Sequence, residues 1–121
     1  TTTRKQSMEV ILAIKNGLQV DLQGQIGRYD DGFNINCVGD TFQSLKVPTV
    51  LFEAGHFVND YNREEVRGFV YKSLIIALRY IAINKVSGVN YEGYFEIPEN
   101  GKQFYDIIIR NGQFNNQNLE L

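Results

Sequence analysis

The chain has 121 residues, of which 43% are hydrophobic and 21% are charged, and its formal net charge is −2. This composition is that of one globular domain and excludes a chain disordered throughout. The small negative charge gives no general attraction to nucleic acid or to anionic lipid, so we expect neither nucleic acid nor a membrane as a partner. A single cysteine, Cys37, excludes an internal disulfide, and a single histidine, His56, excludes a three-histidine metal site.

The first third of the chain predicts one helix and one long loop. Apolar residues at helical spacing indicate an amphipathic helix from Arg4 to Leu18, with Thr3 as its N-cap. Residues 24–40 are rich in Gly, Asn and Asp, which predicts a loop with a short strand at 26–29. Residues 41–46 are expected to form a helical turn. Loops of this kind often carry binding residues.

A strand and a long helix are predicted next. The run Thr49–Phe52 is short, apolar and β-branched, which is typical of a strand covered on both faces. The clearest helix begins at Asn62, where Glu65 three residues later makes a capping-box start, and continues to about Asn84. Its apolar residues recur at helical spacing, so we expect this helix to pack on a sheet.

The remaining residues predict two further strands and a polar tail. The strands are expected at Tyr91–Ile97 and at Phe104–Arg110, with a turn between them. Residues 111–121 are polar and are predicted to be disordered. No internal repeat or long linker divides the chain, so residues 1–121 are interpreted as a single domain.

One carboxylate stands out as a candidate for chemistry. The sequence has no P-loop and no complete G-x-G-x-x-G, C-x-x-C, H-E-x-x-H or G-x-S-x-G motif, which removes support from most enzyme classes. Glu53 directly follows the predicted apolar strand, and ligands of open α/β sheets bind beyond the carboxyl ends of strands. Between Phe52 and Ala54 it is expected to be desolvated, which suits a general base. Alternatively, Glu53 caps a neighbouring helix or pairs with Arg63 or Arg67.

The residues around Glu53 carry a family resemblance. The stretch from Arg28 to Leu78, which includes PTVLFEAGHFVNDYNRE, resembles the C-terminal part of zinc metallocarboxypeptidases of the carboxypeptidase A-like family, and most of all a bacterial cytoplasmic-type branch. The stretch YFEIPENGKQFYDIIIRN is similar to the end of those proteins. The resemblance implies a fragment of a three-layer α/β/α fold, with long amphipathic helices on a partial mixed sheet. It also implies a peptide substrate, a zinc cofactor in the intact protein and a cytoplasmic location.

The same resemblance assigns roles to individual residues. It implies that Glu53 activates a zinc-bound water as general base and then protonates the leaving amine. It makes Tyr29 the candidate for a mobile tyrosine over the cleft, and it places Asp40 in the segment that lines the specificity pocket. Arg28, next to Tyr29, is a candidate contact for the substrate carboxylate. The residues alone equally allow Asp40 to be a turn-forming aspartate and Arg28 a solvated loop arginine.

The chain departs from that family at the metal site. Relatives bind zinc through an H-x-x-E pair and a later histidine, but the only histidine here, His56, is followed three residues later by Asn59. We therefore expect the zinc ligands to lie upstream, in a part of a longer protein, and this chain alone to bind no zinc and to be inactive. His56 is either a contact beside Glu53 or a loop histidine. Cys37 is interpreted as a small packed side chain.

Two other functions stay open. The chain is alternatively a non-catalytic binding or scaffold domain that retains the half-fold, or part of a related amidohydrolase that deacylates N-acyl amino acids. A truncated sheet exposes strand edges and the apolar face of the long helix, which predicts contact with the remainder of the catalytic domain or self-association into a homo-oligomer.

Overall fold

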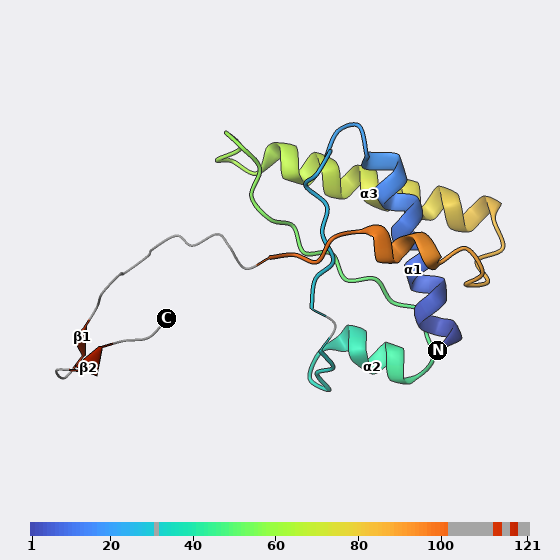
Figure 1. Cartoon of the computed structure of the whole chain (residues 1–121). Helices are drawn as coiled ribbons and strands as arrows, with labels where there is room; N and C mark the ends of the chain where they lie inside the picture. The colour runs from blue at the N-terminus through green and yellow to red at the C-terminus, as the bar shows by residue number, and fades with distance from the viewer. Residues whose placement is uncertain (31, 102–112, 115–116, 119–121) are drawn as a thin grey trace.

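Helices make up most of the regular structure (Figure 1). The computed structural model describes residues 1–30, 32–101, 113–114 and 117–118. In chain order the elements are α1 (Thr2–Leu18), α2 (Val38–Ser44), α3 (Glu64–Ile83), the 3-10 helix η1 (Glu92–Glu96), and the two-residue strands β1 (Gln113–Phe114) and β2 (Gln117–Asn118). The two strands pair antiparallel. Of the helices described, none combines the length and apolarity that a bilayer crossing demands.

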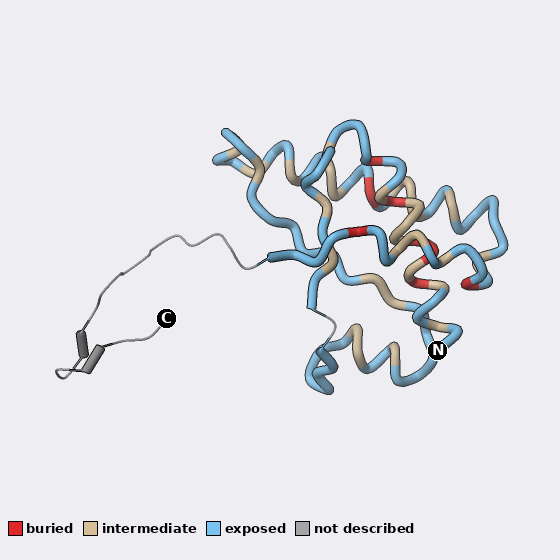
Figure 2. The backbone as a smooth tube through the Cα atoms, viewed as in Figure 1, coloured by how far each residue is buried: buried red, intermediate tan, exposed pale blue. Residues whose placement is uncertain are grey.

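The core lies where α1 meets α3. Val10, Ile14 and Leu18 recur every fourth residue on α1, share one face of that helix and are buried. The side chains packed against them are Leu22 and Ile26 from the loop after α1, Ile76, Ala77 and Tyr80 from α3, and Val86 from the loop after α3. At Gly17 the two helices approach so closely that an added Cβ would lie 2.7 Å from Ile76 Cδ1. Figure 2 shows the buried residues gathered along α1 and the segments that face it.

A buried carboxylate joins α1 to the second half of the chain. Glu9 on α1 is only 2% exposed. Its Oε1 accepts a hydrogen bond from the Tyr80 hydroxyl at 2.9 Å, and its Oε2 accepts one from the Gly88 N–H at 2.7 Å. One turn away, the Gln6 side-chain amide donates to the Val86 carbonyl at 2.9 Å. These bonds hold α1 to α3 and to the loop that follows α3.

A second long-range contact joins the loop after α1 to the segment after η1. The Arg28 N–H donates to the Pro98 carbonyl at 2.7 Å, and the Asn100 N–H donates to the Arg28 carbonyl at 2.8 Å. This isolated parallel bridge between Arg28 and Glu99 is all that forms of the strand expected at 26–29. Ile97, just before the bridge, is 1% exposed.

The helix predictions are confirmed, while their N-caps differ. The helix expected at 4–18 starts at Thr2, and Thr1 is its N-cap in place of Thr3, because the Thr1 Oγ1 accepts the Arg4 N–H at 3.3 Å. The turn expected at 41–46 is the second half of α2. The long helix is present as α3, and its N-cap is Arg63, with φ +63°. The capping box at Asn62 is therefore wrong.

The strand predictions fail for two different reasons. Residues 49–52 form neither strand nor helix, because no neighbouring strand among the described residues offers them hydrogen bonds. Residues 92–96 coil into η1, where Tyr94 N–H donates to the Tyr91 carbonyl and the rings of Tyr91 and Phe95 meet edge to face. The sheet expected under α3 is thus not formed by described residues, and α3 packs on α1. Residues 104–110 lie outside the described residues.

The predicted disordered tail, residues 111–121, is described only at β1 and β2. The rest of that tail lies outside the described residues, so its disorder stays a prediction.

Removing the Tyr80 hydroxyl tests the tie between α1 and α3. In Tyr80→Phe the ring is kept, but the buried Glu9 loses one of its two donors, so we expect the free energy of unfolding to fall by about 1–2 kcal/mol at neutral pH. Urea unfolding measures the loss. Tyr61→Phe, at a fully exposed ring, is the matched control and should leave the midpoint unchanged.

The difference in the free energy of unfolding between wild type and Tyr80→Phe should also depend on pH. Desolvation, together with the hydrogen bond and charge of Glu9, raises the pKa of Tyr80 above its ordinary 10.0. A raised pKa stabilises the folded state fully below pH 10.0, and this contribution is lost as pH rises through the raised value. The advantage of the wild type over Tyr80→Phe should therefore shrink in strongly alkaline solution. An advantage that grows with alkaline pH would contradict the hydrogen-bond assignment.

Candidate functional site

Glu53 lies on an irregular segment that is fixed near both of its ends. Before it, the Thr49 N–H donates to the hydroxyl of Ser7, a buried residue of α1, at 3.0 Å. After it, the Arg63 guanidinium donates from Nη2 to the Ala54 carbonyl at 2.8 Å. Glu53 itself is exposed. The desolvation expected for this carboxylate from its apolar neighbours is therefore absent, because the predicted covering strand and sheet are not formed.

The alternative pairing of Glu53 with an arginine is also not seen. Arg67 forms its ion pair with Glu64, one turn earlier on α3, and Arg63 uses its guanidinium on the Ala54 carbonyl. Neither arginine forms an ion pair with Glu53 in the part of the chain that the structure describes. The Glu53 carboxylate is thus free of any described salt bridge and faces solvent.

A shallow groove begins directly beside Glu53. Its volume is about 350 Å³, and it lies between the segment after Glu53 and the first half of α3. Its walls are mostly apolar, and its lining residues are Ala54, Arg63, Val66, Arg67, Val70, Tyr71 and Leu74. The ring of Phe57 packs edge to face against Phe69 at 5.2 Å between centroids, which holds the segment near α3.

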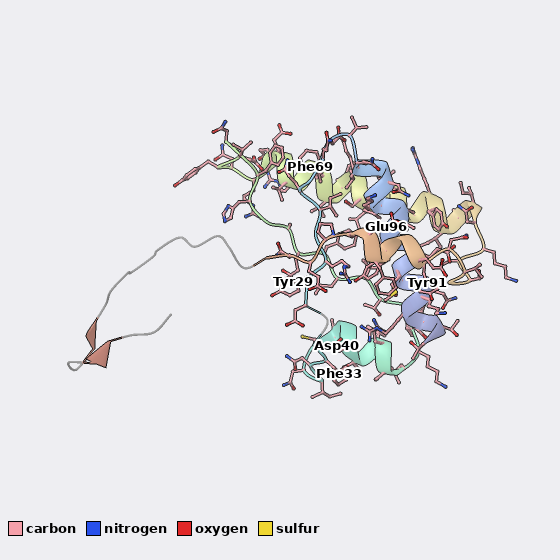
Figure 3. The ribbon with its side chains drawn as sticks, in the orientation of Figure 1. Tyr29, Phe33, Asp40, Phe69, Tyr91 and Glu96 are labelled. Carbon is pink, nitrogen blue, oxygen red and sulfur yellow. The ribbon has the colours of Figure 1, made fainter. Side chains whose placement is uncertain are left out.

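The other candidate site residues lie on separate loops. Tyr29 is 54% exposed, so its ring is available to solvent. Asp40 lies in the first turn of α2, where its Oδ2 accepts the Asn34 N–H at 2.8 Å and so closes the loop of residues 34–40, which follows Phe33 (Figure 3). This is the geometry of a turn-forming aspartate. No described contact joins Glu53 to Tyr29 or Asp40.

Arg28 is engaged within the protein. Its Nε donates to the Ile97 carbonyl at 2.7 Å, and its Nη2 lies 3.2 Å from Glu99 Oε1. Its guanidinium carbon is 5.6 Å and 5.9 Å from the ring centroids of Tyr94 and Phe95. These contacts give Arg28 a role in fixing the bridge after η1. To bind a substrate carboxylate, it would first have to leave the Ile97 carbonyl.

The described residues do not fit a zinc ion. His56 and Cys37 are both exposed and lie on different segments. Within the described ranges, no three His, Cys, Asp or Glu side chains gather closely enough to hold a metal. A catalytic zinc requires about three protein ligands, so no step of a reaction is assigned here to a metal held by these residues.

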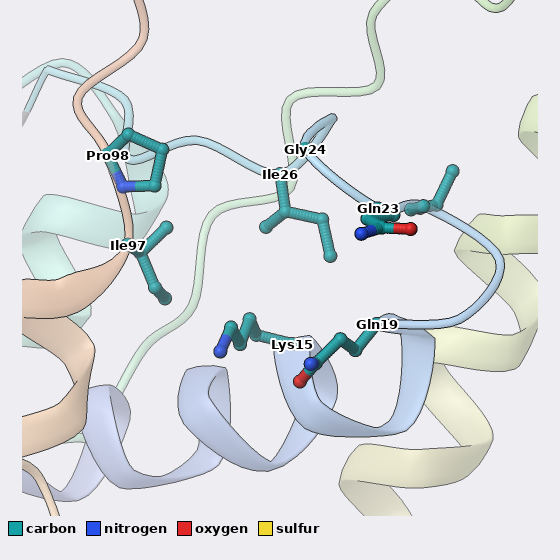
Figure 4. Close-up of a pocket in the computed structure, with 8 residues that line it drawn as sticks. Lys15, Gln19, Gln23, Gly24, Ile26, Ile97 and Pro98 are labelled. Atoms are coloured by element: carbon teal, nitrogen blue, oxygen red, sulfur yellow. The ribbon is translucent and has the colours of Figure 1, made fainter.

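Sequence reasoning missed a second cavity, of about 210 Å³, between α1 and the loop that follows it (Figure 4). Ile26 and Ile97 give it apolar walls, and Lys15, Gln19 and Gln23 contribute polar side chains. No local motif marks this cavity, because its walls come from residues that are more than seventy positions apart in the chain.

Sequence reasoning also missed the side chain that caps the first N–H groups of α3, which belongs to Asp60, three residues before the N-cap position Arg63. Asp60 Oδ1 accepts the Glu65 N–H at 3.2 Å, and its Oδ2 accepts the Val66 N–H at 2.9 Å. Desolvation raises the pKa of Asp60, but the hydrogen bonds from Val66, Glu65 and Glu64 and the charge of Arg63 outweigh it and hold this pKa below 3.8. The sequence does carry a signal for this cap, because Asp60 is an acidic residue shortly before the helix, but Asn62 was an equally suitable residue type closer to it.

Comparisons of the chain with protein-family models, curated proteins and solved structures found no match.

Replacing Asp60 tests the cap. Asp60→Ala removes the acceptor of two backbone N–H groups at the positive end of α3, and we expect the Tm to fall by about 5 °C at neutral pH. Asp60→Asn retains a side-chain oxygen and should lose less. Thermal unfolding followed by circular dichroism measures both, and equal Tm values for wild type and Asp60→Ala would exclude the cap.

The lowered pKa of Asp60 determines how the Tm difference between wild type and Asp60→Ala changes with pH. A carboxyl with a depressed pKa stabilises the folded state above its unfolded value of 3.8, and this contribution disappears as pH falls through the depressed value. The Tm difference between wild type and Asp60→Ala should therefore narrow in acid. A difference that widens in acid would contradict an ionised cap.

Proposed function

We propose that this chain is the C-terminal part of the catalytic domain of a zinc-dependent metallocarboxypeptidase, with Glu53 as general base. The observation that carries the proposal is the segment PTVLFEAGHFVNDYNRE, in which Glu53 follows an apolar run and precedes a long helix. The intact enzyme would hydrolyse C-terminal peptide bonds. A cytoplasmic location belongs to the same proposal, since the resemblance is to a cytoplasmic-type branch and the single cysteine allows no internal disulfide.

The surroundings of Glu53 support the idea that another part of a larger domain supplies strands beside it. Leu51 is 66% exposed and Phe52 is 38% exposed, although both belong to an apolar run typical of a strand covered on both faces. No backbone hydrogen bond links residues 50–53 to any other described residue. An extended apolar segment without ladder partners fits a central strand whose neighbouring strands are supplied by another part of a larger domain. On this proposal, the α/β/α fold forms only in the intact protein.

The proposed chemistry requires little of the rest of this chain. Glu53 accepts a proton from the attacking water and returns it to the leaving amine, which is the work of a general base that becomes a general acid. Adding the missing strands would bury Leu51 and Phe52 and desolvate the carboxylate beside them, as the base requires. Tyr29, with its exposed ring, is proposed to contact substrate, and Asp40 and Arg28 are the weaker candidates because both are bonded to the backbone.

The test uses the full-length protein that contains this chain. Glu53→Gln retains size and hydrogen-bonding capacity but removes the base, so kcat on short peptides with a free C-terminus should fall by about 100-fold or more, with little change in KM. Glu96→Gln, at an exposed glutamate of η1, is the matched control and should retain wild-type kcat.

Three outcomes would contradict the proposal in different ways. Unchanged kcat in Glu53→Gln would remove Glu53 from the mechanism. Hydrolysis of N-acyl amino acids but not of peptides would identify the amidohydrolase branch. A full-length sequence without an H-x-x-E pair and a further histidine upstream would leave a non-catalytic binding domain.

A further inference from the structure

The cavity of about 210 Å³ beside the end of α1 has walls from three segments of the chain (Figure 4). We refer to it as the α1 cavity. Lys15 comes from α1, Ile26 from the loop that follows, and Ile97 from the segment after η1. The hydrogen bond from Arg28 Nε to the Ile97 carbonyl joins the last two of these segments. No residue of α3 is among the described residues that line the α1 cavity, so it lies apart from the groove beside Glu53.

A partly buried cation lines the α1 cavity without a described counter-ion. Lys15 is half-buried, whereas every other described lysine is exposed, namely Lys5, Lys46, Lys72 and Lys85. The Lys15 ammonium forms neither an ion pair nor a hydrogen bond with a described residue. No Asp or Glu is among the described lining residues. Lysine is rarely removed from water unless an anion balances it, so the α1 cavity offers a place for one negative charge.

The other walls of the α1 cavity determine what should be attached to that charge. Ile26 and Ile97 face Lys15 across the cavity, which favours an aliphatic group between them (Figure 4). The exposed carboxamides of Gln19 and Gln23 are not hydrogen-bonded to described residues, and each can donate an N–H to an anion. Apolar walls with a few polar groups are the usual lining of a small-molecule site.

We propose that the α1 cavity binds a small monocarboxylate with a branched aliphatic chain. The Lys15 ammonium and a glutamine amide donate to the carboxylate oxygens, and the aliphatic chain packs on Ile26 and Ile97. The volume of about 210 Å³ is below the range of pockets for drug-sized ligands, so only a small molecule fits. A free amino acid and a short fatty acid share this chemistry. The proposal goes beyond the peptidase assignment and does not depend on it.

The dipole of α1 narrows the choice of anion. Lys15 is the basic residue in the last turn of α1, at the negative end of the dipole. This position would stabilise a lysine that extends into water equally well, so the dipole does not explain why Lys15 is half-buried at a cavity. The same negative end disfavours a doubly charged phosphate, because a single ammonium would have to offset both charges. A single carboxylate matches the one charge of Lys15.

The first experiment titrates the 121-residue chain with isocaproate and follows the methyl NMR signals of Ile26 and Ile97. We expect both signals to shift along one saturating curve, while those of Leu51, outside the α1 cavity, stay unchanged. Lys15→Gln should weaken binding by about 10-fold or more, because the ligand loses a charge-assisted hydrogen bond. Lys85→Gln is the matched control: it removes the same charge from an exposed lysine that does not line the cavity, and it should bind as the wild type does.

The second experiment keeps the wild-type protein and varies the ligand. Isocaproamide has nearly the same shape without the charge, so it should bind at least about 10-fold more weakly than isocaproate. Leucine adds an ammonium group: tighter binding than isocaproate would support the proposal with an amino acid as the ligand, and weaker binding would support it with a fatty acid. No shift with either carboxylate at millimolar concentration, equal affinity for isocaproate and isocaproamide, or unchanged affinity in Lys15→Gln would each overturn the proposal. Lys15 would then serve the helix dipole alone.

Discussion

The buried carboxylate of Glu9 is the constraint on which the rest of the described structure depends. A carboxylate that is removed from water must have its oxygens satisfied by hydrogen-bond donors, and here the donors come from α3 and from the loop after it. Gly88 is suited to this contact, since its φ of +76° disfavours other residues and an added Cβ would lie 2.8 Å from Lys5 Cβ. The polar contact thus fixes how the apolar faces of α1 and α3 meet.

The sequence predicts the helices well and the strands poorly, for a physical reason. Helical periodicity is local, so the spacing of Val10, Ile14 and Leu18 is visible without knowing what covers them. A strand exists only with a neighbour, and the composition of Thr49–Phe52 shows no neighbour. In Tyr91–Ile97 the aromatic residues suggested a strand, but their contacts three and four positions apart favour a 3-10 turn.

The candidate site residues, like the fold, could be predicted from the sequence only where the pattern is local. Glu53 is found from its position after an apolar run, but its exposure depends on strands that the described residues do not supply. Arg28 was a candidate for substrate binding because it is next to Tyr29, whereas its bond to the Ile97 carbonyl joins residues that are 69 positions apart. Contacts of that range are invisible to local patterns. The cap at Asp60 could have been predicted from the sequence, because Asp and Asn are both common helix-capping residues.

The long-range bonds of α1 have a consequence for synthesis on the ribosome. Helix α1 leaves the ribosome before α3, yet Gln6 and Glu9 bond to residues that are 71 to 80 positions later. Until α3 and Gly88 have left the exit tunnel, the apolar face of α1 has only Leu22 and Ile26 among its described partners, and Glu9 has neither of its two donors. Of the described helices, α1 therefore waits longest for its contacts during synthesis, and its apolar face is open to chaperones in that interval.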